Sequence, residues 1–171
     1  MELEDLEFTL ADQKDIDQIW SLMEGSIALR KEDGSTQWQD GYPNLTVLRS
    51  DIEKSWGYVL KSQDKIWAYL AAHIGQEPAY DKIDGAWISQ DDFYVIHRIT
   101  ADRKGAGKGL GRKIIESLEH LAKKQNISSV RMDTNHDNYS MLRILEKMGY
   151  TFCGTVYHRG EARKAFEKKL F

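Results

Sequence analysis

The sequence has little of several residue types, and each shortage excludes a class of protein. It contains one cysteine in 171 residues, so neither an internal disulfide framework nor a cysteine-based zinc site is expected. Only two prolines are present and charged residues make up 30%, a composition typical of soluble globular chains rather than disordered or fibrous ones. No stretch approaches the roughly 18 consecutive apolar residues of a membrane-spanning helix. We therefore expect a globular protein with no membrane segment and no metal site.

The charge balance also restricts partners and location. The net charge is -3, which argues against a general nucleic-acid binder, because such proteins usually carry a basic domain. The first residues, Met1 to Asp5, are acidic where a secretory signal is basic. The lone Cys153 is typical of a reducing compartment. The sequence therefore predicts a cytoplasmic protein.

One segment stands out against this acidic background. Residues 103–113 contain four glycines, five cations and no acid. An apolar run over 94–101 precedes them, and from Leu110 onward apolar residues recur at helical spacing, as at Ile114 and Leu118. A strand is therefore expected to enter a helix through glycines. The cations crowd a helix N-terminus, which favours a bound anion such as a phosphate at its free N–H groups.

Periodicity and turn residues predict the remaining elements. The order of strand, long helix and strand around the glycine segment predicts a parallel crossover, and the fold class is a mixed α/β (α+β) sheet in one layered domain, residues 1–171. The expected elements are a strand at 6–10, a helix from 12 to about 31, a loop at 32–44, a helix at 45–57 ended by Gly57, strands at 58–60 and 66–74, a loop at 75–92, a strand to 101, a helix at 110–126, a strand at 127–134, a helix from a cap at 137 or 138 to 148, and a closing antiparallel pair at 150–157 and 164–170.

Two common phosphate-binding patterns fail on the glycine segment. No window supplies the P-loop's Gly-x-x-x-x-Gly-Lys followed by Ser or Thr, and neither Gly105 nor Gly107 begins a complete G-x-G-x-x-G. Residues 106–111 instead resemble the pyrophosphate-binding signature (Arg/Gln)-x-x-Gly-x-(Gly/Ala) of the GNAT superfamily of acetyl-CoA-dependent N-acetyltransferases. Gly109 and Gly111 fill its glycine places.

A second segment supports the same resemblance. Residues 138–150, Asn-Tyr-Ser-Met-Leu-Arg-Ile-Leu-Glu-Lys-Met-Gly-Tyr, are similar to the family's Asn-x-x-Ala-x-x-Leu-Tyr-Glu-Lys-x-Gly-Phe segment. The strand ending at 97–101 resembles the family's fourth strand, and the order of elements over residues 6–171 also fits. The resemblance implies a single-domain GNAT-like fold, with a central mixed sheet flanked by helices, and acetyl-CoA or coenzyme A as cofactor.

The resemblance also implies which residues hold the cofactor, and it has two departures. Ala106 stands at the signature's Arg or Gln place, which leaves Lys104, Lys108 and Arg112 as nearby cations. Leu145 stands where many members have the tyrosine that protonates the leaving thiolate. The implied cofactor residues are Ile99, Thr100, Ala101, Gly107, Lys108, Gly109, Leu110, Gly111, Arg112 and Asn138.

The implied activity is direct transfer of an acetyl group from acetyl-CoA to a primary amine of a small molecule or peptide. The alternative, motivated by Leu145 and Ala106, is a catalytically silent acyl-CoA-binding sensor or regulatory domain.

Transfer to an amine requires a base, because an alkylamine is mostly protonated at neutral pH. Glu77 and Asp92 are candidate bases, or else solvated acids; Tyr94 and Tyr139 are candidate acids, or else packing residues. His97 is either a general base or, as a histidine within an apolar strand more often is, a hydrogen-bonded core residue; the second interpretation is favoured.

The acceptor site is expected on two segments that carry aromatic and acidic residues. Trp38 and Tyr42 lie in the first predicted loop, and Tyr80 and Trp87 lie in the second. These rings either wall a substrate pocket, where Glu77 would suit a cationic amine, or anchor the loops by packing. The candidate substrate residues are Trp38, Tyr42, Glu77 and Tyr80. The sequence leaves the acceptor and a homodimer open, and no nucleic-acid or membrane partner is expected.

Overall fold

A computed structural model describes residues 2–171, which form two compact units. The first unit holds the residues up to Ala72 together with Arg98–Ile115, and the second holds His73–His97 and Glu116–Phe171. Strand β3 (Lys65–Ile74), strand β5 (Phe93–Ala101) and helix α4 (Leu110–Lys124) each begin in one unit and end in the other. The chain therefore passes between the units inside regular elements.

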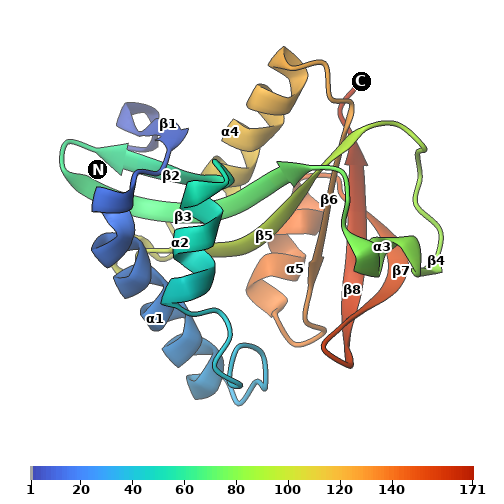
Figure 1. Ribbon diagram of the computed structural model, residues 1–171, viewed down its shortest axis with the longest axis horizontal. Coiled ribbons are helices and arrows are strands. Elements are labelled where there is room, and N and C mark those ends of the chain that lie inside the picture. The colour runs from blue at the N-terminus through green and yellow to red at the C-terminus, as the bar shows by residue number, and fades with distance from the viewer. Residues whose placement is uncertain (1) are drawn as a thin grey trace. The chain divides into compact units, whose positions relative to one another are not determined.

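The first unit is an antiparallel meander with two helices. Strands β1 (Glu7–Leu10), β2 (Gly57–Ser62) and β3 pair in sequence order. Figure 1 shows helices α1 (Ile16–Glu32) and α2 (Leu45–Glu53) beside them. Asp12 forms a capping box with Asp15 in the turn that leads into α1, and Asn44 caps α2. A buried core joins helices and strands through Ile19, Met23, Leu48, Ile52, Val59, Ile66, Tyr69 and Ala71.

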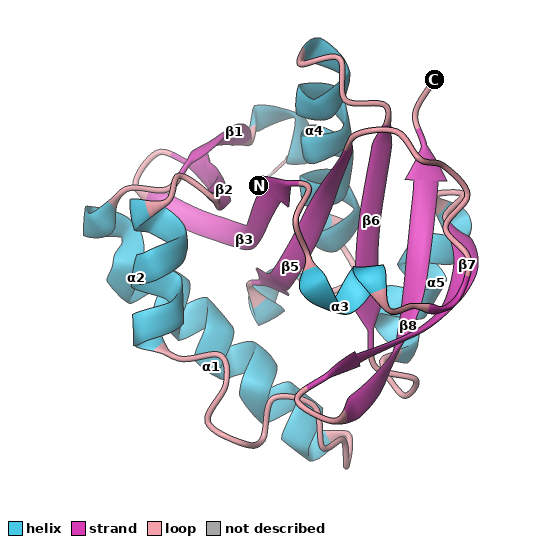
Figure 2. Ribbon diagram, turned by 45° about the vertical axis from the view of Figure 1, so that its right-hand side comes forward, coloured by secondary structure: helices cyan, strands magenta, loops and turns pink. Residues whose placement is uncertain are grey.

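The second unit contains the parallel crossover. Strand β5 pairs in parallel with β6 (Ser129–Thr134), while β8 (Glu161–Lys169) is antiparallel to both β6 and β7 (Thr151–His158). A two-residue strand, β4 (Asp84–Gly85), pairs with β7. Helix α5 (Tyr139–Lys147) follows β6, and Figure 2 shows the short helix α3 (Pro78–Asp81) beside β7. Tyr80, Val95, Val156 and Ala165 form a buried cluster.

The predicted fold class is confirmed. The eight strands follow the order β1-β2-β3-β5-β6-β8-β7-β4 in a mixed sheet. The strand-helix-strand crossover is present as β5, α4 and β6, because β5 and β6 are parallel. Among residues 2–171, no helix combines the length and the apolar character that crossing a membrane requires.

Two local predictions were wrong. The helix predicted to end at Gly57 ends at Glu53, and Gly57 instead begins β2 opposite Ala71. Ser55, with a φ of 58°, turns the chain out of the helix before that strand. The segment 75–92, predicted as a loop, contains α3 and β4. Pro78 suits the first turn of a helix, but four-residue and two-residue elements are too short to leave a periodic pattern.

Candidate active site

The second unit gathers three histidines and two carboxylates. His73 lies near the end of β3 and His97 lies on β5, the neighbouring strand in the sheet. Glu77 immediately precedes α3, whose first residue is Pro78. The chain leaves β3 and turns at once into α3, so that Glu77 returns toward both histidines.

Glu77 is the centre of the first group. Its Oε2 lies 3.0 Å from His97 Nε2 and 3.9 Å from His73 Nε2. The two imidazole rings are stacked, with centroids 5.4 Å apart. His73 is buried, and the Glu77 and His97 side chains are 16% and 15% exposed. A carboxylate with two imidazole neighbours thus lies just below the surface of this unit.

Asp133, on β6, is the centre of the second group. Its Oδ1 accepts a hydrogen bond from the Tyr80 hydroxyl at 2.6 Å and lies 3.2 Å from His158 Nε2. The His158 ring meets the His97 ring edge-on, at a centroid distance of 6.4 Å. The two groups therefore form one continuous cluster, defined here as the histidine cluster: His73, Glu77, His97, Asp133 and His158.

Charge keeps both carboxylates of the histidine cluster ionised. Burial raises the pKa of Glu77, but the His97 hydrogen bond and the electrostatic effect of the neighbouring imidazoles outweigh it and leave that pKa below its usual value. Burial likewise opposes ionisation of Asp133, and the bond to His158 outweighs it, so that its pKa is also lowered. The hydrogen bond to Asp133 raises the pKa of His158. Burial, with Asp133 beside it, raises the pKa of Tyr80 well above its usual range.

The aromatic residues of segment 75–92 hold this arrangement in place. Tyr80 is 1% exposed, and its ring lies 4.8 Å from that of Trp87, centroid to centroid. The Trp87 Nε1–H donates to the Tyr80 carbonyl at 3.0 Å. Tyr80 thus lies beneath the site and fixes Asp133, while Glu77 keeps some solvent access.

The glycine segment lies in the first unit and has the backbone of an anion site. Gly107 and Gly109 have φ angles of 77° and 84°, in the left-handed region that other residues rarely adopt. Within the described chain the N–H groups of Gly109, Leu110 and Gly111 have no hydrogen-bond partner. These groups begin α4, where the helix dipole favours negative charge. The segment therefore fits a pyrophosphate, as the sequence predicts for coenzyme A.

A second backbone irregularity lies on β5, just before the predicted cofactor residues Ile99, Thr100 and Ala101. The parallel register of β5 with β6 runs from Phe93 to Ile96. Arg98 then has a φ of 54°, which interrupts the regular pleat.

Buried polar side chains of the first unit hold Arg98 in this conformation. Asp51 accepts from Arg98 Nε at 2.8 Å and Nη2 at 2.6 Å, and the Tyr69 hydroxyl also donates to it at 2.8 Å. Arg98 Nη1 donates to the Tyr42 hydroxyl at 2.6 Å. Burial favours the neutral form of Arg98, yet Tyr42 and Asp51 outweigh it and raise the pKa of the guanidinium.

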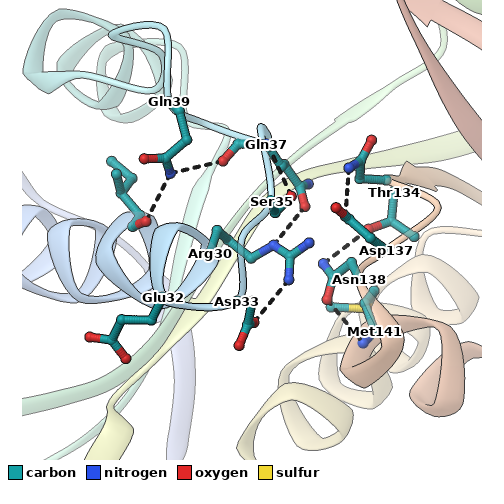
Figure 3. A network of polar contacts seen from close by, with 12 residues as sticks. Arg30, Glu32, Asp33, Ser35, Gln37, Gln39, Thr134, Asp137, Asn138 and Met141 are labelled. Atoms are coloured by element: carbon teal, nitrogen blue, oxygen red, sulfur yellow. Dashed lines mark hydrogen bonds and ion pairs between the residues drawn. The ribbon is translucent and has the colours of Figure 1, made fainter.

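Asn138, the remaining predicted cofactor residue, caps α5 in the second unit (Figure 3). Its Oδ1 accepts from the Met141 N–H at 3.3 Å, and its Nδ2 donates to Thr134 Oγ1 at 3.1 Å. One amide hydrogen of Nδ2 is enough for the Thr134 bond, and the second can serve another acceptor. Its predicted bond to pantetheine stays a prediction.

The other predicted candidates lie in varied surroundings. Asp92 is exposed beside Phe93, and Tyr139 is 67% exposed at the start of α5. Tyr94 is buried and donates to Gln125 at 2.6 Å, away from the histidine cluster. Trp38 packs against the core of the first unit. Leu145 is fully buried.

Several site residues were missed or underrated from the sequence. His73, Asp133 and His158 were not considered, and for His97 a hydrogen-bonded core position was favoured over a role as general base. Three of the five histidines lie on strands, at His73, His97 and His158. This placement was the signal that the sequence offered: a histidine on a buried strand needs a hydrogen-bond partner, and three such histidines indicate a polar cluster.

The Acetyltransferase (GNAT) family model matches residues 20–150 of the chain. The chain is 26% identical over 168 residues to the Uncharacterized N-acetyltransferase YesJ of Bacillus subtilis, covering 92% of this chain and 86% of that protein. It is also 26% identical over 149 residues to an Aminoglycoside N(6')-acetyltransferase type 1 of Klebsiella pneumoniae, covering 77% and 74%.

A solved structure resembles the chain over nearly its whole length. The GNAT-family acetyltransferase from Streptococcus agalactiae has 33% sequence identity and a TM-score of 0.88. The match covers 96% of this chain and 95% of that one. Sequence and fold thus point to the same group of proteins.

Proposed function

Because this chain belongs to the acetyltransferase (GNAT) family and is an N-acetyltransferase, we propose that its acceptor is a primary amine of a polycationic small molecule. The observation that carries this proposal is the acidic segment that contains Glu77. Residues 76–92 contain five carboxylates and one lysine, and the Glu77 side chain is partly exposed. A negative surface attracts a polycation and positions its amines. The named substrate of the aminoglycoside relative belongs to this chemical class.

We assign the cofactor to the first unit. The N–H groups of Gly109, Leu110 and Gly111 would hold the pyrophosphate, with Lys108 and Arg112 near it in sequence. The backbone of Ile99–Ala101, beyond the Arg98 irregularity, would bond the pantetheine arm. Bound acetyl-CoA supplies the acetyl thioester that the amine attacks.

Glu77 is the proposed general base. An alkylamine with a pKa near 10 arrives protonated, and an ionised carboxylate can hold the ammonium and accept its proton. The imidazoles of His97 and His158 continue from Glu77 toward Asp133 and offer the proton further positions. With Leu145 at the place of the usual tyrosine, the leaving thiolate takes its proton from solvent.

The test is turnover with a panel of amines, followed by the release of free coenzyme A thiol. Aminoglycosides, linear polyamines, a monoamine and a peptide with a free N-terminus cover the acceptor classes. We expect acceptor-dependent release with the polycations, and the Glu77→Gln variant should lower kcat by about 10² to 10⁴, the range of general base catalysis.

Glu146→Gln, at an exposed carboxylate on α5 outside the acidic segment, is the matched control and should leave kcat unchanged. Equal loss in both variants would indicate a general charge effect and remove Glu77 from the mechanism. The catalytically silent acyl-CoA sensor is not favoured, because the relatives are named N-acetyltransferases. Tight acetyl-CoA binding with no release for any amine would revive it.

A further inference from the structure

We propose that His73, Glu77 and His97 bind a divalent transition-metal ion, with Zn²⁺ as the best fit, and that the bound ion stops acetyl transfer. The three side chains each offer one ligand atom, and these atoms all lie within 4.8 Å of one another. They come from neighbouring strands and the turn that follows one of them. The site has the two-histidine, one-carboxylate donor set that zinc enzymes use.

The distances are close to those of a formed site. Zinc binds imidazole nitrogen and carboxylate oxygen at about 2.0 to 2.2 Å, which puts ligand atoms of a tetrahedron roughly 3.4 Å apart. Glu77 Oε2 is 3.0 Å from His97 Nε2 and 3.9 Å from His73 Nε2, on either side of that separation. Side-chain shifts of about 1 Å therefore bring all three atoms to one ion.

The donors also select the kind of ion. Two imidazoles disfavour Ca²⁺ and Mg²⁺, which take mainly oxygen ligands, and favour zinc, copper or nickel. Three protein ligands leave a fourth position for water. The partial exposure of Glu77 and His97 gives an ion access from solvent, while His73 is buried at the back of the site.

The effect on turnover rests on the proposed role of Glu77. A carboxylate that binds Zn²⁺ has its lone pairs engaged and cannot accept a proton from an ammonium group. The ion would also repel a polycationic acceptor. Metal binding and amine binding thus compete for one carboxylate, which would make this N-acetyltransferase sensitive to free zinc.

Binding can be measured without any activity. Protein stripped with EDTA is titrated with Zn²⁺ against a chromophoric chelator, and with Co²⁺ to record the visible absorption bands of the coordinated ion. We expect one ion per chain. His97→Ala and Glu77→Gln should each weaken binding about 100-fold, at the upper end of the losses that even outer-shell changes produce.

His120→Ala is the matched control, because His120 is an exposed histidine on α4 outside the histidine cluster. It should bind Zn²⁺ as the unchanged chain does. Unfolding curves in EDTA verify that each variant is folded, and His97→Gln replaces His97→Ala if the smaller side chain disrupts the strand. Equal zinc affinity in the unchanged chain and the His97 variant would overturn the site.

Turnover then tests the second half of the proposal separately. Acetyl transfer should fall as Zn²⁺ occupies the site and return on addition of EDTA. If zinc binding depends on Glu77 and His97 but turnover does not change, the proposed inhibition is wrong, and so is the role of Glu77 as base. The metal site itself would still be supported. Absence of turnover in metal-free protein would count against the proposed function and leave the binding result intact.

Discussion

The candidate functional residues of the two units are of different kinds. In the first, the features that matter are backbone features: the positive φ of Arg98 on β5, and the open N–H groups at the start of α4. In the second, they are side chains, because the histidine cluster brings imidazoles and carboxylates within hydrogen-bonding distance. The candidate residues of the first unit act through a fixed backbone conformation. Those of the second unit act through side chains that can exchange protons or bind ions.

The buried polar groups show why this difference matters. Asp51 and Arg98 are joined by two hydrogen bonds of an ion pair, and each also bonds one tyrosine hydroxyl. These bonds fix both side chains in one conformation. Glu77 instead has two imidazole neighbours at unequal distances. A fully satisfied network is rigid, whereas an imidazole can donate, accept or bind a metal. Rigid backbone suits a cofactor, and adaptable side chains suit proton transfer.

The largest predicted effect comes from breaking the rigid network. Asp51→Asn leaves the Arg98 guanidinium buried without its counter-charge, since the two side chains are 4% and 9% exposed. Loss of one partner of a buried ion pair costs about 3 to 5 kcal/mol. Urea unfolding should show that loss of stability, and calorimetry should show weaker acetyl-CoA binding as the irregularity in β5 relaxes.

Glu32→Gln is the matched control for Asp51→Asn. Glu32 also makes a two-point ion pair, with Arg103, but both side chains are at least half exposed. Solvent screens such a pair, so the unfolding midpoint should not move measurably. Similar losses in both variants would mean that burial does not distinguish the Asp51 network.

A smaller effect is predicted for the glycine segment. Gly109→Val places a β-branched residue at a φ of 84° and covers the open N–H groups. Valine disfavours this conformation by about 1 to 3 kcal/mol, and recovering it to present the N–H groups on binding corresponds to a roughly tenfold to 100-fold loss of coenzyme A affinity. Isothermal titration measures it.

Gly160→Val tests the strain alone, because Gly160 has a φ of 78° with open space around it, in the turn between β7 and β8. We expect some loss of stability but unchanged coenzyme A affinity. A Gly109→Val variant that binds coenzyme A normally would remove the pyrophosphate from this segment.

The sequence predicted the fold well where patterns were long. The apolar period from Leu110 through Ile114 and Leu118 located α4, and the strand before and after it led correctly to the parallel crossover. The short elements α3 and β4 were missed, because each spans only about one period and so shows no repeating pattern. The end of α2 was misplaced because Ser55, rather than the nearby Gly57, adopts the left-handed conformation.

The site was harder to predict for a different reason. The glycine segment is local in sequence, so its backbone role could be proposed directly. Arg98 and Asp51 are 47 residues apart, and His158 and Asp133 are 25 apart. Such pairs form only when helix α2 packs beside β5 and when β7 joins the sheet, and no single segment of the sequence records them. Glu77 could be proposed as a base from its charge alone. Its two histidine neighbours could be identified only from the folded structure.

The smallest predicted effect concerns Glu167, and it tests whether a rigid polar network is also present in the second unit. Glu167, on β8 of the second unit, is fully buried and accepts from the hydroxyls of Ser89 and Ser129 at 2.7 and 2.6 Å. Burial opposes its ionisation, but these bonds, the charge of Arg131 and the Ile88 N–H lower its pKa. It therefore resembles Asp51 more than Glu77.

Because the pKa of Glu167 is lower folded than unfolded, its charge stabilises the fold above the unfolded value of about 4.3. That contribution is lost as pH falls through the lower, folded pKa. Glu167→Gln should thus cost about 1 to 2 kcal/mol at pH 7 and progressively less below pH ~4. Urea unfolding across this range measures it, with the exposed Glu146→Gln on α5 as control. If the loss of unfolding free energy does not vary with pH, it comes from the altered hydrogen bonding and packing of the side chain rather than from its charge. Glu167 would then not be comparable to Asp51.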